Sequence, residues 1–399
     1  IARLPGFRFF GNVTFGTDIS HLEYKQFYDC IVYAVGAETD RHMNIPGEEL
    51  EGSFSATEFV GWYNGHPDYL HKTFDLSAEN IAVIGMGNVA IDAARILAKT
   101  ADELADSDIA DYALEALKHN KVKDIYLIAR RGPVQAAFSP QELKELLELE
   151  MADVSIDPDA LDLDSASEDA LKSADKNTAD NVCIMRNIHI DPDLSKPRRL
   201  HLMFLHSPVE LYEKDSKVSG IKLVKNKLEL GANGRISSKA TEETIDLPVG
   251  LVFRSIGYRG RSLPDVPFDT DKAIIPNVCG RVTDLDHDKV IPGEYVIGWA
   301  KRGPSGVIGT NKPDAVETTS LLLKDFSENT VDELDDNLKP EAIEAYLKSK
   351  NIDYVTFKDW KLLDKYEVEI GHQHGKPREK VTTVKEMLAI IKEQRARQT

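Results

Sequence analysis

The stretch Asn80–Leu97, NIAVIGMGNVAIDAARIL, decides the fold that we predict for this chain. Its residues 81–84 are all apolar and mostly β-branched, as in a strand buried on both faces of a parallel sheet. Residues 85–90 (GMGNVA) then give the pattern G-x-G-x-x-A, and apolar residues continue at helical spacing. A strand, a glycine turn and a helix in this order predict one βα unit of a Rossmann-like α/β domain.

The glycine turn has the composition of a dinucleotide-binding site. Gly85 makes the tight turn, Gly87 lets a pyrophosphate approach the backbone, and the small Ala90 lets the helix pack on the strand. The N–H groups at the helix start then face the phosphates. The alternative is an α/β crossover whose glycines serve only packing.

Two arginines follow the next predicted strand, Lys121–Ala129. An NAD site has an Asp or Glu at this strand end for the ribose 2′-hydroxyl, whereas an arginine suits the 2′-phosphate of NADP. Arg130 and Arg131 therefore favour NADP(H). The alternative is a solvated strand end. Helical residues 102–119 make the crossover longer than usual.

Composition limits the class of protein. The 399 residues are enough for two domains, and the net charge of −18 argues against nucleic acid as a partner. No apolar run is long enough to span a bilayer and no signal peptide opens the sequence, so we expect a cytoplasmic protein without a membrane span. The three cysteines are far apart and form no C-x-x-C, so we expect reduced thiols and no metal site.

Other segments give weaker expectations. Ser55 with Glu58 predicts a capping box at the start of a helix, and Pro140 opens another helix. Residues 151–182 are acidic and poor in large apolar side chains, which predicts a partly flexible surface excursion. We further expect a strand pair at 7–15, buried strands at 28–34, 247–256 and 293–297, antiparallel strands at 200–204 and 221–230, and C-terminal helices at 340–350 and 383–398.

A second glycine-rich stretch, Gly298–Thr310 (GWAKRGPSGVIGT), leads into a predicted helix. Its N–H groups suit a phosphate or a polarised ring edge. The alternative is a Gly/Pro loop around a buried tryptophan. There is no G-x-S-x-G elbow and no H-E-x-x-H motif, which fits an enzyme whose cofactors carry the chemistry.

Several stretches together resemble adrenodoxin reductase and its bacterial ferredoxin–NADP reductase relatives, from about Phe7 to the C-terminal helix. They are VIGMGNVAIDAARIL (83–97), LIARRGPVQAAFSPQEL (127–143), IPGEELEGSFSATEFVGWYNG (45–65), SIGYRGRSLPDVPFD (255–269), GWAKRGPSGVIGTNKPDA (298–315) and GKPREK (375–380). The resemblance implies an α/β flavoprotein oxidoreductase with two interleaved Rossmann-like dinucleotide-binding domains. An NADP domain (41–263) would be inserted in an FAD domain (1–40 and 264–399).

The resemblance also implies residue roles. Gly87, Asn88 and Val89 would cradle the NADP pyrophosphate, and Arg130 with Arg131 would hold the 2′-phosphate. The complete cofactor-binding set is Gly85, Met86, Gly87, Asn88, Val89, Arg130, Arg131, Glu142, Trp299, Gly306, Val307 and Ile308.

Glu142 is the catalytic candidate, because the resemblance places it near the nicotinamide. Its alternative role is an ordinary acid favoured by the helix dipole. Trp299, Gly306, Val307 and Ile308 would contact FAD, with Gly306 also near the nicotinamide. NADPH would pass a hydride to the flavin, which would release electrons singly to an iron–sulfur ferredoxin.

One departure keeps other functions open. The family begins with its own G-x-G-x-x-G unit for the FAD pyrophosphate, and no such unit precedes Asn80, so we expect a fragment of a longer protein. The alternatives are a non-catalytic NADP(H)-binding module or another two-dinucleotide flavoprotein, such as a disulfide reductase or a glutamate synthase electron-input subunit. The missing C-x-x-C and cluster cysteines count against the last two. We expect a monomer whose partner is an acidic ferredoxin, met by one of the basic clusters at 196–199, 259–261 or 301–302, unless these are simply solvated.

Overall fold

The computed structural model divides the chain into two compact units, each built from two segments: Ile1–Arg41 with Gly257–Leu362, and His42–Ile256 with Leu363–Thr399. We call them the first and the second unit. The structure describes all residues except 1, 5, 189–194, 232–233, 286–288, 307, 329, 331–338 and 398–399, and it leaves out the side chain of residue 308. The units interleave along the sequence, as the resemblance implied. The predicted division put 264–399 in one domain, whereas here the residues from Leu363 onward group with 42–256.

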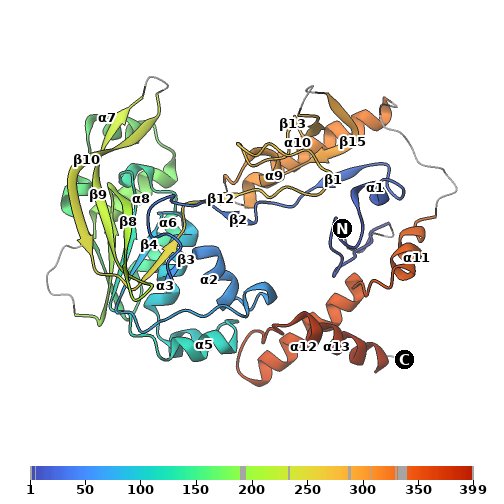
Figure 1. Cartoon of the computed structure of the whole chain (residues 1–399), viewed down its shortest axis with the longest axis horizontal. Helices are drawn as coiled ribbons and strands as arrows, with labels where there is room; N and C mark the ends of the chain where they lie inside the picture. The colour runs from blue at the N-terminus through green and yellow to red at the C-terminus, as the bar shows by residue number, and fades with distance from the viewer. Residues whose placement is uncertain are drawn as a thin grey trace. The chain divides into compact units, whose positions relative to one another are not determined.

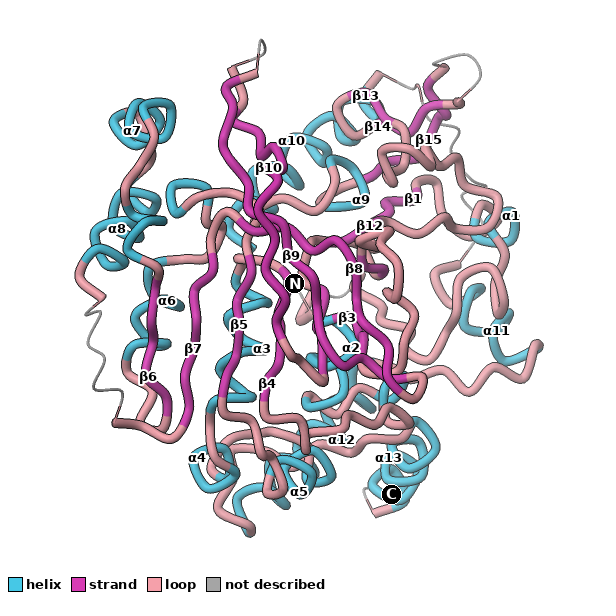
Figure 2. Tube along the Cα trace, turned by 60° about the vertical axis from the view of Figure 1, so that its left-hand side comes forward, coloured by secondary structure: helices cyan, strands magenta, loops and turns pink. Residues whose placement is uncertain are grey.

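The second unit is built on a six-stranded sheet in the order β3-β11-β4-β5-β7-β6, in which every neighbouring pair is parallel. Its strands are β3 (Ser53–Ser55), β4 (Asn80–Ile84), β5 (Asp124–Ile128), β6 (Ala152–Ile156), β7 (Arg198–Met203) and β11 (Leu251–Arg254). Figure 2 shows β6, β7, β5 and β4 side by side. β4 is central, and four of its five residues are fully enclosed, as the apolar run predicted.

Helices cover one face of this sheet, and an antiparallel sheet packs on the other. The helices of the unit are α2 (Ala56–Tyr63), α3 (Asn88–Ala98), α4 (Ala101–Ala105), α5 (Asp111–Leu117), α6 (Pro140–Leu147), α7 (Ser165–Lys172), α8 (Lys176–Arg186) and α13 (Val384–Ala396), with short 3-10 turns at Pro67–Tyr69, Pro133–Gln135 and Pro158–Leu161. The antiparallel sheet is β10-β9-β8, from β8 (His206–Lys214), β9 (Lys217–Leu230) and β10 (Ile236–Leu247). Ile84 and Ile128 of the parallel sheet pack with Ile221 and Leu223 of β9 in one core.

Two expectations for the second unit were wrong. Residues 151–182 are not a flexible excursion: they supply β6, α7 and most of α8, and bury Val182 completely. The segment predicted as an antiparallel strand at 200–204 lies in β7, which is parallel to both neighbours. The small and polar residues of 151–182 gave no clear apolar pattern for these elements. In β7 the alternation of apolar and polar residues indicated a strand but not its direction. The capping box at Ser55 and Glu58 is confirmed.

The first unit contains a four-stranded sheet in the order β1-β15-β14-β13. Its elements are α1 (His21–Tyr24), β1 (Ile31–Tyr33), β2 (Thr39–Asp40), β12 (Tyr258–Arg259), β13 (Asn277–Val278), β14 (Arg281–Thr283), β15 (Val290–Val296), α9 (Trp299–Arg302), α10 (Ile308–Ser327), α11 (Ala342–Ser349) and the start of α12 (Phe357–Gln373). β1 runs parallel to β15, whereas the other pairs are antiparallel. Figure 1 shows α10 beside β15, and the bidentate pairing of Arg281 with Asp325 ties the end of that helix to β14.

The strand pair expected at 7–15 does not form. Gly11 makes an isolated bridge with Val355, and Phe15 makes another with Ile19. Phe7 and Phe9 instead pack edge-on against Phe357. The chain does turn at Gly11-Asn12, where Asn12 has a φ of 56°. The segment that pairs with this turn, at Val355, is distant in the sequence.

Candidate functional site

The glycine turn after β4 is held by the neighbouring strands β5 and β11. Gly85 donates its N–H to Ile128 O at 2.9 Å, and it has a φ of 140° that L side chains rarely adopt. A Cβ at this position would lie 2.1 Å from the carbonyl oxygen of Ser255. Gly85 is therefore required by the backbone conformation and by the close approach of the strand end.

In front of Gly87 the turn is open. Gly87 is the N-cap of α3 with a φ of −118°, and a Cβ built there meets no described atom within 4 Å. No described side chain caps the helix start. The space in front of Gly87 can therefore admit an anionic ligand, because helix N-termini attract negative charge. Ala90 behind the turn is fully buried, as expected for the small third residue.

Hydrogen bonds connect this turn to the loop that carries Glu142. Ala137 donates its N–H to Met86 O at 2.8 Å, and Ser139 donates its N–H to Asn88 Oδ1 at 2.8 Å. Ser139 is in turn the N-cap of α6, where its Oγ accepts from the Glu142 N–H. The start of α6 is thereby fixed beside the start of α3.

Glu142 belongs to an ion-pair cluster between α3 and α6. Its Oε2 lies 3.2 Å from Arg95 Nη1, which also pairs with Glu145, while Arg95 Nη2 pairs with Asp92. Oε2 is buried and has no hydrogen-bond partner of suitable geometry among the described residues. Burial raises the pKa of Glu142; the charge of Arg95 opposes this rise, and Asp92 and Glu145 add to it. The buried oxygen of Glu142 is therefore stabilised by the nearby Arg95 cation and not by a well-aligned hydrogen bond.

The two arginines after β5 have fixed backbones and available side chains. Asn226 Nδ2 donates to Arg130 O at 2.9 Å, and Leu205 donates its N–H to Arg131 O at 3.1 Å. Both arginines are exposed, and no described acidic group pairs with either. Burial of part of the side chain, together with the adjacent Arg130 charge, lowers the pKa of Arg131. A dianion between the two guanidinium groups would relieve this repulsion.

The second glycine-rich stretch, in the first unit, is bonded to itself. Gly298 has a φ of 66° and donates its N–H to Asp314 Oδ2 of α10. Lys301 is buried and its Nζ lies 3.0 Å from Asp314 and 2.6 Å from Glu317. Burial lowers the pKa of Lys301, but these two carboxylates more than offset it, so the net direction is upward.

The rest of this loop closes on Ser305. Trp299 Nε1 donates to Ser305 O at 3.2 Å, and Arg302 bonds both oxygens of Ser305. Trp299 is half-buried and its ring lies 5.5 Å from that of Tyr258. Gly306 is exposed with a φ of 76°, residue 308 begins α10, and Val307 lies outside the described residues. A Cβ built at Gly303 or Gly309 meets no described atom within 4 Å, so the backbone there has room for a ligand.

Comparisons with known proteins give relatives over almost the whole chain. No protein-family model matches the chain. The NADPH-ferredoxin reductase FprA of Mycobacterium tuberculosis is 42% identical over 390 residues, covering 97% of this chain and 83% of that protein. The mitochondrial NADPH:adrenodoxin oxidoreductase of Arabidopsis thaliana is 39% identical over 394 residues, covering 96% and 80%. The solved structure of Mycobacterium tuberculosis FprA in complex with NADPH matches with a TM-score of 0.90 at 41% identity, covering 98% of this chain and 84% of that one.

The chain belongs to the adrenodoxin reductase-like family. The predicted α/β architecture with two interleaved Rossmann-like units is confirmed as well. None of the described helices is long and apolar enough to cross a bilayer.

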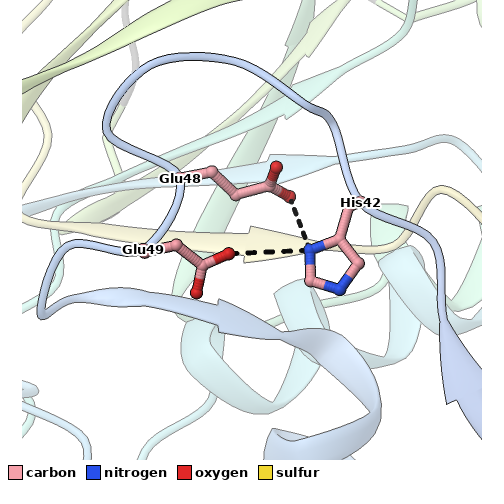
Figure 3. A group of neighbouring side chains, drawn as sticks. All are labelled: His42, Glu48 and Glu49. Carbon is pink, nitrogen blue, oxygen red and sulfur yellow. Dashed lines mark ion pairs between the residues drawn. The ribbon is translucent and has the colours of Figure 1, made fainter.

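One group of side chains among the described residues has the donor atoms for a metal ion, although we expected none. His42 Nδ1 lies 3.6 Å from Glu48 Oε1 and 3.7 Å from Glu49 Oε1 (Figure 3). Glu48 is buried, and its two oxygens accept the N–H groups of Met43 and Asn44 at 2.7 Å each, while Arg254 Nε lies 3.3 Å away. Its carboxylate is thus committed to the loop and to Arg254, and we assign no metal here.

Of the three basic clusters at 196–199, 259–261 and 301–302, the first and the last make bonds that stabilise the fold. Arg198 Nη1 donates to the last carbonyl groups of α3, at 2.7 Å for Ala98 and 2.6 Å for Lys99, and Arg199 pairs with Asp124 at 2.6 Å. Lys301 is buried. Arg259 and Arg261 are exposed, and Arg259 donates to Thr270 O.

Sequence reasoning missed one part of the site. Arg130 and Arg131 line a pocket of about 700 Å³ together with residues of the hairpin between β9 and β10. The lining residues of the hairpin are Gly231, Arg235, Ile236, Ser237 and Ser238. These residues lie about a hundred positions after the arginines in the sequence. The one sequence signal for them is a basic residue, Arg235, at a predicted hairpin.

Proposed function

We propose that this chain is a ferredoxin–NADP reductase that takes electrons from NADPH, passes them through FAD and delivers them to an iron–sulfur ferredoxin. The single observation that carries the proposal is the open glycine turn at Gly87 with the exposed pair Arg130 and Arg131, in a chain 42% identical to a reductase of that kind. The turn leaves space in front of a helix N-terminus for a pyrophosphate, and the arginines supply charge for a 2′-phosphate.

Glu142 is proposed as the residue beside the nicotinamide. Its side chain is 24% exposed and lies at the start of α6, which Ser139 bonds to Asn88 at the start of α3, so the exposed part of the carboxylate can accept an N–H from the carboxamide group of the ligand. Arg95 holds the buried Oε2 at 3.2 Å. Glu142 would thus orient the nicotinamide and would not itself transfer a proton.

The first unit is proposed to hold FAD along residues 298–310. Gly303 and Gly309 leave room for a ligand, and the internal bonds of Lys301 and Trp299 fix the loop, so the residues present fit a flavin. When bound, FAD supplies the conversion from two-electron hydride chemistry to one-electron transfer. Trp299, Gly306, Val307 and Ile308 are the proposed contacts.

The partner is proposed to be an acidic ferredoxin that docks at the exposed arginines 259 and 261. Lys196–Arg199 and Lys301 are engaged within the chain, which leaves this cluster as the best of the three. We further propose that the chain is a monomer and that it works in the cytoplasm. The three cysteines are free thiols, which fits a reducing compartment.

The test is reconstitution of the purified chain with FAD, followed by flavin absorption and NADPH-dependent reduction of cytochrome c through added ferredoxin. We expect a bound-flavin spectrum and a rate that needs both NADPH and ferredoxin. Binding of NADPH without any retention of FAD would overturn the reductase and support the NADP(H)-binding module instead. Retention of FAD with reduction of a small disulfide substrate would support the other flavoprotein class.

A further inference from the structure

The hairpin between β9 and β10 forms one wall of the pocket that Arg130 and Arg131 line. Arg235 stands at the start of β10 and is exposed, and Ser237 and Ser238 follow it in the same wall. Three arginines and two serines therefore line one pocket of about 700 Å³. No acidic residue lines this pocket among the described residues.

Hydrogen bonds join the hairpin to the loop that carries Arg130 and Arg131, which we call the arginine loop. Asn226 of β9 is buried, and its side chain donates both to Arg130 O at 2.9 Å and to Ser207 Oγ at 2.8 Å. Its N–H donates to Leu205 O at 2.6 Å, and Leu205 donates to Arg131 O. β9 pairs with β10 from Leu230↔Ile236 onward, so the position of Arg235 follows from that of the arginine loop.

We propose that Arg235 is a specificity residue for NADP(H): it contacts the 2′-phosphate in the pocket that it lines with Arg130 and Arg131. This inference rests on the proposed function, because it takes the ligand of the arginine loop to be NADP(H). A phosphate monoester has three terminal oxygens, and two bidentate guanidinium groups donate four hydrogen bonds to them, which leaves acceptor sites for a further donor. Arg235 supplies the third cation, and Ser238 supplies a hydroxyl donor.

The experiment uses the whole chain and isothermal titration calorimetry with 2′,5′-ADP, and with 5′-ADP as the probe that lacks the 2′-phosphate. Arg235→Ala is expected to raise the Kd for 2′,5′-ADP by about 10-fold, the loss of roughly one charge-assisted hydrogen bond, and to change the Kd for 5′-ADP less than about 2-fold. Arg235→Lys keeps the charge and should recover part of the affinity. The position is exposed, so the variants fold.

Lys239→Ala is the matched control, because Lys239 lies on the same strand and pairs with Glu229 outside the pocket. If Lys239→Ala weakens 2′,5′-ADP as much as Arg235→Ala, the effect is one of general charge and the inference falls. If Arg130→Ala discriminates between the two probes and Arg235→Ala does not, the inference falls but the proposed function stands. If none of the three arginines discriminates, the NADP(H) site itself is overturned.

Discussion

Two glycine-rich turns that look alike in sequence differ in what their backbones and charges are bonded to. The turn at 85–89 in the second unit is supported from behind by Ser255 and Ile128 and is open in front. The turn at 298–306 in the first unit is fixed by its own side chains, with Lys301 on Asp314 and Trp299 on Ser305, and is open at Gly303. The turn at 85–89 is thus fixed by neighbouring strands, whereas the turn at 298–306 is fixed by internal side-chain bonds.

The basic residues of the two regions also differ in what their side chains are bonded to. Arg130 and Arg131 have their backbones bonded and their side chains exposed, so their charge is available to a ligand. Lys301 is buried between two carboxylates, and its charge is neutralised inside the loop. A basic side chain next to a glycine turn is therefore a binding group in one unit and a structural one in the other.

The largest effect is expected at the back of the open turn. Gly85→Ala should lower the free energy of unfolding by about 4 kcal/mol, because it combines a left-handed backbone conformation with a Cβ placed 2.1 Å from Ser255 O. Urea denaturation followed by circular dichroism measures this loss. A variant as stable as the wild type would show that the strand end of β11 does not constrain the turn.

A slightly smaller loss is expected in the self-bonded turn. Lys301→Ala should cost about 3 kcal/mol, because it leaves Asp314, whose side chain is 9% exposed, without its closest cation. Arg302→Ala, on the exposed side of the same loop, is the control and should cost less. If Lys301→Ala is neutral for stability, the loop does not depend on its internal charges.

The arginine pair should affect binding and not stability. The double variant Arg130→Ala/Arg131→Ala should raise the Kd for NADPH by about 100-fold, or about 3 kcal/mol, and leave the Kd for NADH nearly unchanged. Fluorescence titration with each nucleotide gives both constants. Equal losses for NADPH and NADH would contradict the 2′-phosphate role.

A pH-dependent effect is expected in the first unit, where Arg281 and then Tyr295 hold the pKa of Asp325 below its usual range, although burial opposes them. A carboxyl group with a lowered pKa stabilises the fold at pH above its unfolded value, and this contribution disappears as the pH falls through the folded pKa. Thermal unfolding between pH 7 and pH 3 should show the wild type losing stability in the acid range. Asp325→Asn should be less stable at pH 7 and should lack this part of the pH dependence.

The smallest effect on stability is expected at the front of the open turn. Gly87→Ala should change the free energy of unfolding by less than about 0.5 kcal/mol, since its φ is negative and a Cβ meets nothing. The same substitution should weaken NADPH binding, because the methyl group occupies the space in front of the helix. A variant that binds NADPH as well as the wild type does would place the pyrophosphate elsewhere.

Much of the second unit was predictable because its signals are contiguous. β4, the turn and α3 follow each other within twenty residues, and the capping box at Ser55 lies within one helical turn. Predictions failed where the partner is far along the chain: β7 was predicted antiparallel, and the turn at Gly11 pairs with Val355. Strand direction and long-range pairing depend on segments that no local window contains.

By itself the sequence determined the strand, the glycine turn and the two arginines, since each depends on residue types at adjacent positions. Only the tertiary structure decided which groups surround each charge. It buried Lys301 between Asp314 and Glu317, used Arg198 at the end of α3, and brought Arg235 into the pocket of Arg130 and Arg131. The physical reason is that the availability of a charge depends on the groups that surround it, and the fold brings those groups from distant parts of the chain.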